Sequence, residues 1–550
     1  MLNYVWMSLL FLGIVTALTT DLINKADNKY RNNEPLPVTI EFLPAGQEGS
    51  GPFIKESAKT YNVNILVSRE IFNSFYKDSI KENILFKAKL SVNPEEDKKV
   101  IFFNTDDKSP KIWKEIALVS GKENDITAVL TSLTLTSETS ADAKIILEDA
   151  SFLKLKEVTN SAIDYAMTAV NIALGLIGIM ALWLGVMKVA EDAGLIRIIA
   201  NWLKPVTKKL FPEVPSDHPA MGSMIMNISA NMLGLGNAAT PFGLKAMEEL
   251  DKLNPNKGTA TNSMVTFLAI NTAGMTLIPA TAIAVRAAAG STEPAIIIGT
   301  SLFGAACATI TGVTAAKIFE KFPIKKNDFS GWIKSNSKGI FIVLALLLLI
   351  LIFSVTGAGK IFTSLFSWLS PEIFRDVINI VSIAAIPFLI FTFIGYGALK
   401  KVKVYEQFVE GAKEGFNVAV RIIPYLVAML MAIGIFRAGG GMDWLILILR
   451  PFTDFIGMPA EALPMALMRP LSGSGSLGIM AEIISVHGPD SFMGILVSTF
   501  FGSTETTFYV LAVYFGAVNI KNTRHALPAG LLADIAGILG ALFIVRMLFG

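Results

Sequence analysis

Cysteine, histidine and charged residues are all scarce in this chain of 550 residues. Cys307 is the single cysteine, so no disulfide can form within one chain and no cysteine-based metal site is available. The three histidines, His218, His487 and His525, lack the i, i+4 spacing of a metal-binding helix. Charged residues make up 17% of the chain and the net charge is +2, which gives no reason to expect nucleic acid as a partner. We predict no metal and no other cofactor.

Sequence motifs of catalysis are missing as well. The glycine spacings at 234–239 and 473–478 fit the dinucleotide-binding fingerprint, but that fingerprint requires a preceding strand within a βαβ unit. Both spacings lie inside apolar, helix-like segments instead. No hydrolase elbow, phosphate-binding loop, zinc motif or nucleophile–base pair is visible. We therefore predict that the protein is not an enzyme.

Hydrophobic residues, in contrast, are abundant. They form 52% of the chain, and the mean hydropathy of +0.55 is typical of a polytopic membrane protein. The first residues are apolar over a length that suits a short membrane span, and they lack the positive start of a secretory signal. We predict that residues 1–20 form a retained transmembrane helix, with a cleaved signal peptide as the alternative.

Residues 21–157 differ from the rest of the chain because charges of both signs are dense there. Apolar residues alternate with polar ones in short runs, which predicts an all-β, sandwich-like soluble domain inserted into the membrane protein. A helix is expected at 56–61 or at 69–80. The predicted strands are 38–42, 63–67, 84–92, 99–103, 128–136 and 144–149.

The remaining apolar segments predict an all-α membrane region. Two related parts, 158–322 and 376–550, are joined by a linker at 323–375 that contains an extra transmembrane helix. The predicted spans are 163–187, 259–285, 294–317, 340–356, 377–398, 416–436, 489–515 and 526–548.

Each part also contains an interrupted apolar segment, at 219–250 and at 460–487, which predicts a re-entrant hairpin. An amphipathic stretch that ends in a Leu-basic-Pro triplet precedes each hairpin, with Trp202 and Trp444 as expected interfacial anchors. Because both parts share this order and the extra helix lies between them, we predict an inverted repeat.

Lysine and arginine residues gather in alternate loops of this arrangement. The positive-inside rule then places the N-terminus in the cytoplasm and the β domain outside. We expect a multi-pass protein of the bacterial cytoplasmic (inner) membrane, with the lipid bilayer as its surroundings and a second copy of the chain as a candidate partner.

Polar side chains concentrate in the two hairpins and in the span that follows each of them. Interrupted helices at membrane depth must line a cavity or be buried in protein, so we predict a solute site there. Taken singly, such residues are more often packing contacts between helices. The candidates are Asn227, Ser229, Asn231, Asn237, Thr240, Asn271, Thr276, Ser472, Ser474, Ser503, Thr504, Thr506, Thr507 and Tyr509.

Glu505 is the most informative of the charged residues because a carboxylate within an apolar span is costly and marks an ion, proton or substrate site. Arg469 and Glu482 flank the second hairpin, and Arg469 is the expected partner of a carboxylate. A purely structural Arg–Glu pair is the alternative. Asp534 in the last span is a weaker candidate.

Several long strings of residues resemble a known family. The string N-I-S-A-N-M-L-G-L-G-N-A-A-T-P-F-G at 227–243 resembles spore maturation protein A, while L-M-R-P-L-S-G-S-G-S-L-G at 467–478 and G-S-T-E-T-T-F-Y at 502–509 resemble spore maturation protein B. Both belong to the nucleoside-recognition Gate family, so the chain resembles a fusion of the two. The inserted β domain departs from this pattern, and Glu505 stands where the family pattern has Asp.

The resemblance implies an integral membrane protein with re-entrant hairpins and a small polar, nucleoside-like solute. We therefore predict a transporter or permease, coupled to an ion or to protons through Glu505. The alternative is a non-transporting envelope protein whose outer β domain binds cell-wall material or a partner protein.

Overall fold

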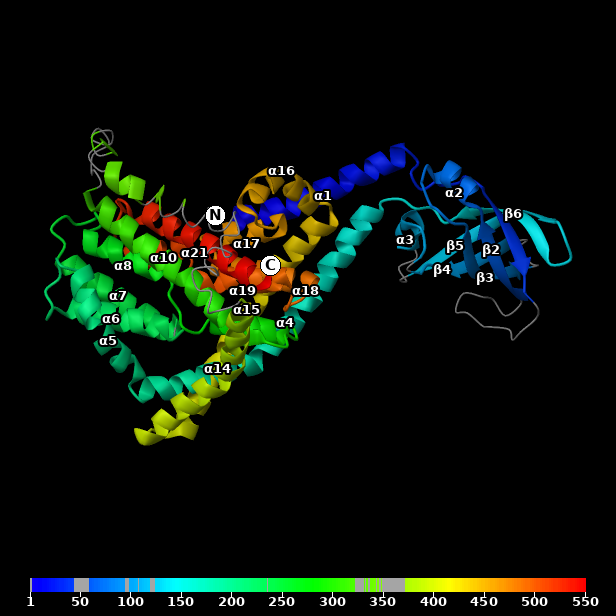
Figure 1. Ribbon diagram of the computed structural model, residues 1–550. Coiled ribbons are helices and arrows are strands. Elements are labelled where there is room, and N and C mark those ends of the chain that lie inside the picture. Colours follow the sequence, from blue (N-terminus) through cyan, green and yellow to red (C-terminus); the bar gives the residue numbers. More distant parts are fainter. Residues whose placement is uncertain are drawn as a thin grey trace. The chain divides into compact units, whose positions relative to one another are not determined.

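The computed structural model describes residues 2–43, 59–93, 98–106, 108–118, 124–234, 236–321 and 371–550, together with separate residues between 331 and 348. The chain folds into two compact units, and Figure 1 shows the ribbon of the whole chain. One comprises Ser8–Ile163 and Gly434–Met442 and contains the β domain. The other comprises Met1–Met7, Asp164–Ile433 and Asp443–Gly550 and is helical.

The β domain is a closed antiparallel barrel in which β1 pairs with both β2 and β6. All six predicted strands are confirmed, but they close into a barrel in place of the expected sandwich because the first and last strands meet. Closure leaves no free sheet edge. The strands are β1 (Leu36–Phe42), β2 (Lys59–Val67), β3 (Ile84–Asn93), β4 (Lys98–Asn104), β5 (Asp125–Leu135) and β6 (Ser140–Leu147).

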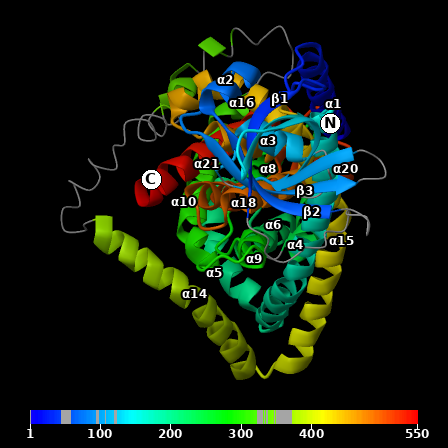
Figure 2. The ribbon, with the colours of Figure 1, turned by 90° about the vertical axis from the view of Figure 1, so that its right-hand side faces the viewer.

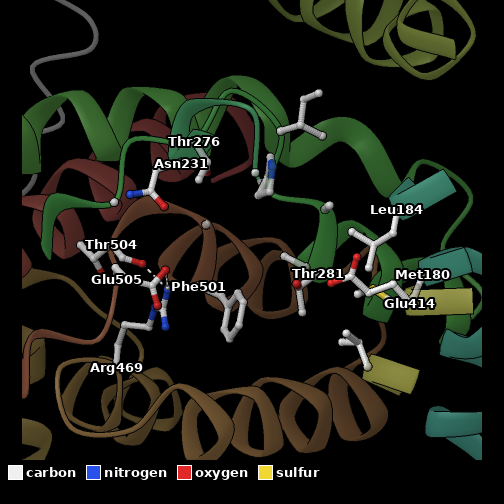
Figure 3. Close-up of a pocket in the computed structure, with 18 of the residues that line it drawn as sticks. Met180, Leu184, Asn231, Thr276, Thr281, Glu414, Arg469, Phe501, Thr504 and Glu505 are labelled. Carbon is white, nitrogen blue, oxygen red and sulfur yellow. Dashed lines mark hydrogen bonds and ion pairs between the residues drawn. The ribbon is translucent and has the colours of Figure 1, made fainter. Parts of the chain in front are cut away.

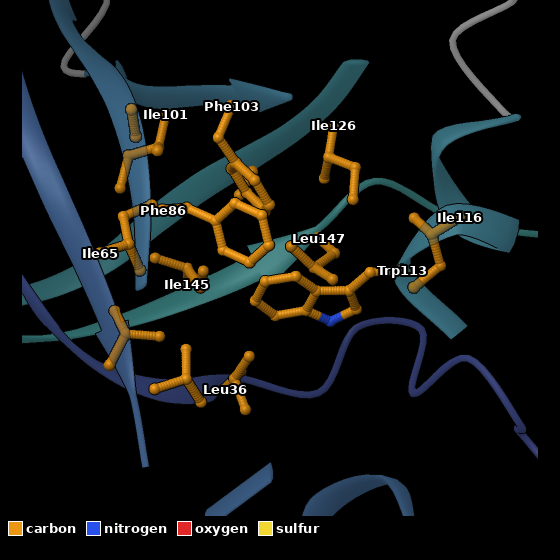
Figure 4. Close-up of a cluster of buried hydrophobic side chains, with 14 of the residues drawn as sticks. Leu36, Ile65, Phe86, Ile101, Phe103, Trp113, Ile116, Ile126, Ile145 and Leu147 are labelled. Carbon is orange, nitrogen blue, oxygen red and sulfur yellow. The ribbon is translucent and has the colours of Figure 1, made fainter. Parts of the chain in front are cut away.

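An aromatic cluster fills the barrel beside α2 (Arg69–Tyr76) and α3 (Lys111–Ala117) (Figure 4). Trp113 of α3 is fully buried and packs against Phe72, Phe86 and Phe103. Its indole donates a hydrogen bond to the Tyr76 hydroxyl at 3.3 Å. The α2 helix was predicted; α3 was not, and it supplies the centre of this core. The predicted helix at 56–61 is not found, because Lys59–Tyr61 belong to β2 and the residues before them lie outside the described ranges.

Helices enter and leave the barrel. The entering helix α1 spans Leu2–Ala26, and the leaving helix α4 spans Leu153–Asp192. The buried carboxylate of Asp21 accepts hydrogen bonds from the backbone amides of Lys154 and Leu155 at 3.0 and 2.9 Å, which caps α4. Both predicted boundaries of the β domain, after residues 20 and 157, therefore fall inside helices.

Five helices among the described residues are long and apolar enough to cross a membrane. They include α1 and α4, and the chain is a multi-pass membrane protein. The predicted helix at 340–356 lies largely outside the described residues. The other three are α10 (Ile297–Ile318, preceded by η1, Pro294–Ile296), α15 (Val404–Ala438) and α21 (Ala526–Phe549).

Within the helical unit, α4 and α15 lie side by side (Figure 2). Gly411 and Gly415 of α15 allow this approach, since a Cβ atom at either position would meet the α4 backbone within 2.5 Å. Small residues that let helix backbones approach are a common feature of membrane interfaces. A further helix, α14, spans Pro371–Leu399 and precedes α15.

The two predicted hairpins are present. The first consists of α6 (Pro219–Met232) and α7 (Gly236–Lys252), and the second of α17 (Leu463–Met468) and α18 (Gly473–His487). Before them run α5 (Leu195–Leu210) and α16 (Gly441–Ile456), with Trp202 and Trp444 exposed. Pro205 and Pro451 were expected at the ends of these helices, but both helices continue beyond them.

Two predicted spans, 259–285 and 489–515, are each broken near the middle. The first becomes α8 (Asn262–Ala273) and α9 (Ala280–Ala288), and the second becomes α19 (Phe492–Ser503) and α20 (Thr507–Ala517). This is a correction, because each had been predicted as one continuous helix. The break after α8 coincides with Gly274 and Pro279, whereas residues 504–506 contain neither glycine nor proline.

Loop contacts establish that the two parts run in opposite directions. The loop after α7 pairs with the loop after α20, where the Ala260 amide donates to the Asn522 carbonyl at 3.0 Å. The end of α9 and the loop that follows it meet the loop after α18, where Arg286 of α9 binds Asp490 at 2.9 Å. Each broken helix therefore starts on the side where the other one ends, as an inverted repeat requires.

Candidate functional site

A cavity of about 430 Å³ lies where the two broken helices approach each other (Figure 3). Residues of both breaks line it, together with side chains from α4 and α15 and from the ends of α6 and α17. Interrupted helices place backbone groups and helix ends at such a position, where they can bind a solute or an ion.

The first break is attached to the first hairpin. Gly274 ends α8 with a φ of +57°, and the Leu277 amide donates to the Met232 carbonyl at the end of α6, at 2.8 Å. Gly234 at the hairpin tip has a φ of +77°, and a Cβ atom there would lie 2.9 Å from the Ile278 carbonyl oxygen. Glycine is therefore needed at both places.

The second break repeats this attachment. The Phe508 amide at the start of α20 donates to the Pro470 carbonyl of the second hairpin at 3.0 Å. The breaks also contact each other, because the Glu505 amide donates to the Thr272 carbonyl at 2.8 Å. A Cβ atom at Gly274 would lie 2.8 Å from Cβ of Glu505. The two interrupted segments thus meet backbone to backbone beside the cavity.

Arg469 holds the second break in place. It is almost fully buried, and its guanidinium donates to the Thr504 carbonyl and, at 3.3 Å, to the Thr506 hydroxyl. The guanidinium also lies over the Phe501 ring, 4.4 Å from its centroid, and 3.8 Å from the Glu505 carboxylate. This ion pair is looser than a hydrogen-bonded one. One Glu505 oxygen also accepts a hydrogen bond from the Thr506 amide at 3.3 Å.

Glu505 is 48% exposed even though it lies between two buried helix ends. Its side chain lines the cavity and faces Arg469, as Figure 3 shows. A carboxylate and a guanidinium side by side can together bind a solute that carries both hydrogen-bond donors and acceptors. These two predicted residues are brought together at the site.

A series of hydrogen-bonded asparagine and tyrosine side chains extends from the cavity into the helical region. Asn231, at the cavity, donates to the side-chain oxygen of Asn271 at 2.9 Å, and Tyr514 of α20 donates to the same oxygen at 3.4 Å. Asn227 donates to Tyr514 at 3.2 Å and to the Ala239 carbonyl at 2.8 Å. Asn227 therefore braces the first hairpin and does not line the cavity.

Five predicted site residues line the cavity: Asn231, Thr276, Arg469, Thr504 and Glu505. Several other predicted residues with described side chains do not line it, and their side chains bind local backbone or neighbouring helices. Ser229 and Ser503 donate to the preceding turn of their own helices, while Ser472 caps α18 with Ser474 beside it.

The remaining predicted residues with described side chains are not among those that line the cavity. Thr507 donates to Asp534, Tyr509 is 56% exposed, and Glu482 is buried within α18. Thr240 belongs to α7, and the side chain of Asn237 lies outside what the structure describes.

Several cavity residues were not predicted. Phe501 contacts Arg469, and α4 contributes Lys188 and Glu191, which pair at 3.1 Å. Glu414 comes from α15. The sequence signal for Glu414 and Lys188 is a charge within a long apolar helix, but nothing in the sequence indicates that α4 and α15 meet at the hairpins.

Two oppositely directed repeats, each with a hairpin and a broken helix around a cavity, define a membrane protein of the transporter-like class. Residues 173–289 and 419–521 match the family model described as "Gate: Nucleoside recognition". Spore maturation protein B of Bacillus subtilis (strain 168) is 52% identical over 175 residues, 32% of this chain and 98% of that protein. No solved structure matches the chain.

Spore maturation protein A of the same organism is 46% identical over 168 residues, 30% of this chain and 84% of that protein. The chain therefore belongs to the spore maturation protein family within the Gate nucleoside-recognition group, and it joins counterparts of both proteins in one polypeptide.

Proposed function

We propose that this protein binds a small polar solute in the cavity between the two breaks and carries it across the membrane. The observation that supports this is the exposure of Glu505 beside buried Arg469, at the point where two oppositely directed broken helices touch. Membrane-buried charges are retained where they serve binding or transport. The family description favours a nucleoside-like solute.

Solute binding is tested with the purified full-length protein in detergent. Nucleosides, amino acids and cell-wall fragments are screened by thermal shift, and hits are followed by uptake into proteoliposomes. Glu505→Gln keeps the shape but removes the charge, so we expect affinity for a hit to fall about tenfold or more, the loss of one charge-assisted hydrogen bond.

Glu410→Gln is the matched control, because Glu410 is an exposed α15 residue paired with Lys413 and lies away from the cavity. Affinity and uptake should remain unchanged in this variant. Equal uptake by wild type and Glu505→Gln would mean that the solute does not pass through this cavity, and it would refute the cavity as the solute site.

We also propose a location in the bacterial cytoplasmic membrane, with the N-terminus and the loop after α7 in the cytoplasm and the barrel outside. Lys257 in that loop and Lys521 in the loop after α20 share one side, since the two loops are hydrogen-bonded. On the opposite side, Arg286 is neutralised by Asp490. This distribution agrees with the positive-inside rule.

Cysteine labelling in intact cells tests the orientation, because Cys307 is the only native cysteine. In a Cys307→Ser background, Thr292→Cys should react with an impermeant maleimide and Lys257→Cys should react only after permeabilisation. The reverse pattern would overturn the proposed orientation.

A role of the barrel in binding cell-wall material or a partner protein is the second candidate. The support is a self-contained closed barrel with its own aromatic core. Deletion of residues 31–149, rejoined by a short Gly/Ser linker between α1 and α4, separates the two candidates. If the deletion leaves solute uptake intact, the barrel is an accessory to transport. If envelope binding is lost while uptake stays intact, the barrel carries that binding.

A further inference from the structure

Behind the cavity, on the far side of the second break, lies a buried carboxylate that the proposed solute site does not use. Asp534 of α21 is 1% exposed. One of its oxygens accepts a hydrogen bond from the Thr507 hydroxyl at 2.5 Å, whereas the other has no hydrogen-bond partner among the described residues. An unpaired buried carboxylate oxygen is costly and indicates a missing partner.

Two more buried oxygens in the same region share this condition. The hydroxyls of Thr272, at the end of α8, and Thr504, in the second break, have no hydrogen-bond partner within the described part of the chain. Both side chains are at most 2% exposed. Hydroxyl groups that donate to nothing remain available as acceptors.

The packing of α21 brings Thr272 and Thr504 to the helix face that carries Asp534. Gly530, Asp534 and Gly537 are spaced i, i+4 and i+7 and therefore share that face. A Cβ atom at Gly530 would lie 3.4 Å from the Thr272 methyl group and 2.9 Å from that of Thr507, and one at Gly537 would overlap the Thr504 methyl group. Asp534 thus lies between Thr272 and Thr504.

The charges of this region favour a cation. Arg469 and Glu505 are near enough to Asp534 to interact with it electrostatically. A bound cation would compensate the charge of the buried Asp534 carboxylate, which Arg469 shares with Glu505. The C-terminal ends of α8 and α19 also converge here, and helix C-termini carry partial negative charge.

We propose that Asp534, Thr272 and Thr504 form a binding site for one monovalent cation, and that the occupant is sodium. Carboxylate and hydroxyl oxygens are the donors that hard cations prefer. Among the described residues, no three His, Cys, Asp or Glu side chains gather to hold a metal ion, so a transition metal is not matched by this donor set.

The site would couple to solute binding, and this part of the inference rests on the proposed function. Thr504 borders the cavity as well as the cation site, and the Thr272 carbonyl holds the Glu505 amide. A cation that fixes Thr272 and Thr504 therefore fixes the position of Glu505 at the cavity. Sodium should accordingly raise solute affinity, and solute should raise sodium affinity to the same extent.

The cation site is tested without any solute. The melting temperature of the purified full-length protein is measured in increasing NaCl, with choline chloride keeping ionic strength constant at one pH. Binding to the folded state raises the melting temperature, and we expect a rise of about 2–4 °C at saturating sodium. Asp534→Asn and Thr272→Val should lose this rise.

Thr266→Val is the matched control. Thr266 lies on the same helix as Thr272, is equally buried, and its hydroxyl also lacks a hydrogen-bond partner among the described residues. It lies about 9 Å from Thr272 along the helix axis, nearer the start of α8. The sodium response should persist in this variant, which separates the loss of a ligand from the loss of any buried hydroxyl.

Three results would overturn the site: no difference between sodium and choline in the wild type, an unchanged sodium response in both Asp534→Asn and Thr272→Val, or loss of the response in Thr266→Val as well. Stabilisation by lowered pH alone, lost in Asp534→Asn, would mean that the carboxylate takes a proton in place of sodium and would equally refute it. A sodium response without any solute binding would leave the site standing and reject the proposed transport function.

Discussion

The backbone amide of Glu505 donates a hydrogen bond to the carbonyl of Thr272 at 2.8 Å, which joins the broken helix of one repeat to that of the other. The bond requires close approach of the two chains, and Gly274 permits it. Residues of both breaks border the cavity beside this contact. Adding one methyl group at Gly274 tests whether the two segments approach this closely.

Gly274→Ala should destabilise the protein by about 1–3 kcal/mol, through a clash with Glu505 as well as backbone strain at a φ of +57°. Thermal unfolding measures the loss, and solute affinity should decrease with it. Gly290→Ala is the control: its φ is +80°, but no atom lies within 4 Å of the added methyl group, so only strain of about 1 kcal/mol is expected. Equal effects of the two substitutions would contradict a close crossing.

The contact between Arg286 and Asp490 joins the repeats on one side of the membrane. Asp490 accepts hydrogen bonds from Ser291 at 2.5 Å and from the Thr292 amide at 2.8 Å, in addition to Arg286. Partial burial raises the pKa of this loop carboxyl, but hydrogen bonds from Ser291 and Thr292 and the charge of Arg286 outweigh burial and hold the pKa below its ordinary value.

A lowered pKa in the folded state stabilises the protein above the unfolded-state pKa of about 3.9, and this contribution is lost as the pH falls through the folded-state pKa. Asp490→Asn should therefore lower the melting temperature at pH 7, and the difference from wild type should shrink below about pH 4. Asp454→Asn, which removes one member of an exposed pair with Arg450, should change little at either pH. A pH-independent difference for Asp490→Asn would argue against the charged contact.

Alternation and hydropathy predicted most of the fold. All six strands of the barrel follow from apolar residues at every second position, as in β3, where Phe86, Ala88 and Leu90 are buried. Barrel closure was not predictable, because the pairing of β1 with β6 joins residues about 100 positions apart and leaves no local pattern.

Breaks in the two spans show where sequence reasoning failed. Residues 492–517 are apolar enough for one helix, and the interruption at 504–506 has no glycine or proline to announce it. It is maintained by tertiary contacts, namely Arg469 on Thr504 and Thr506, and Thr272 on Glu505. Charge in an apolar segment predicted Glu505 and Arg469, and both line the cavity. The predicted Ser229 and Asn227 do not line it, because their side chains bind the backbone and neighbouring helices, as polar side chains in membrane helices often do.

Replacing Arg469 by lysine tests the role of its geometry separately from its charge. Lysine cannot present two donors in a planar fork, so Thr504 and Thr506 would no longer be held together. Arg469→Lys should reduce solute affinity about tenfold, measured by the same thermal-shift titration. Arg197→Lys on the exposed face of α5 should have no effect. Unchanged affinity in Arg469→Lys would show that the second break does not need the guanidinium.

A substitution in the barrel core should destabilise the barrel and leave the membrane region folded. Trp113→Ala removes the fully buried centre of the barrel core, and such a truncation costs about 3–5 kcal/mol. Limited proteolysis should therefore cleave the barrel more rapidly. Trp202→Ala removes a tryptophan that is 82% exposed on α5 and should leave the proteolysis of the barrel unchanged.

Solute binding in the cavity should survive Trp113→Ala, because none of the described barrel residues lines it. The thermal-shift titration of the variant measures this directly. Loss of solute binding together with barrel unfolding would mean that the solute site requires an intact barrel, and it would favour the envelope-binding alternative over an accessory role. Retained binding with a proteolysed barrel would assign solute recognition to the membrane region alone.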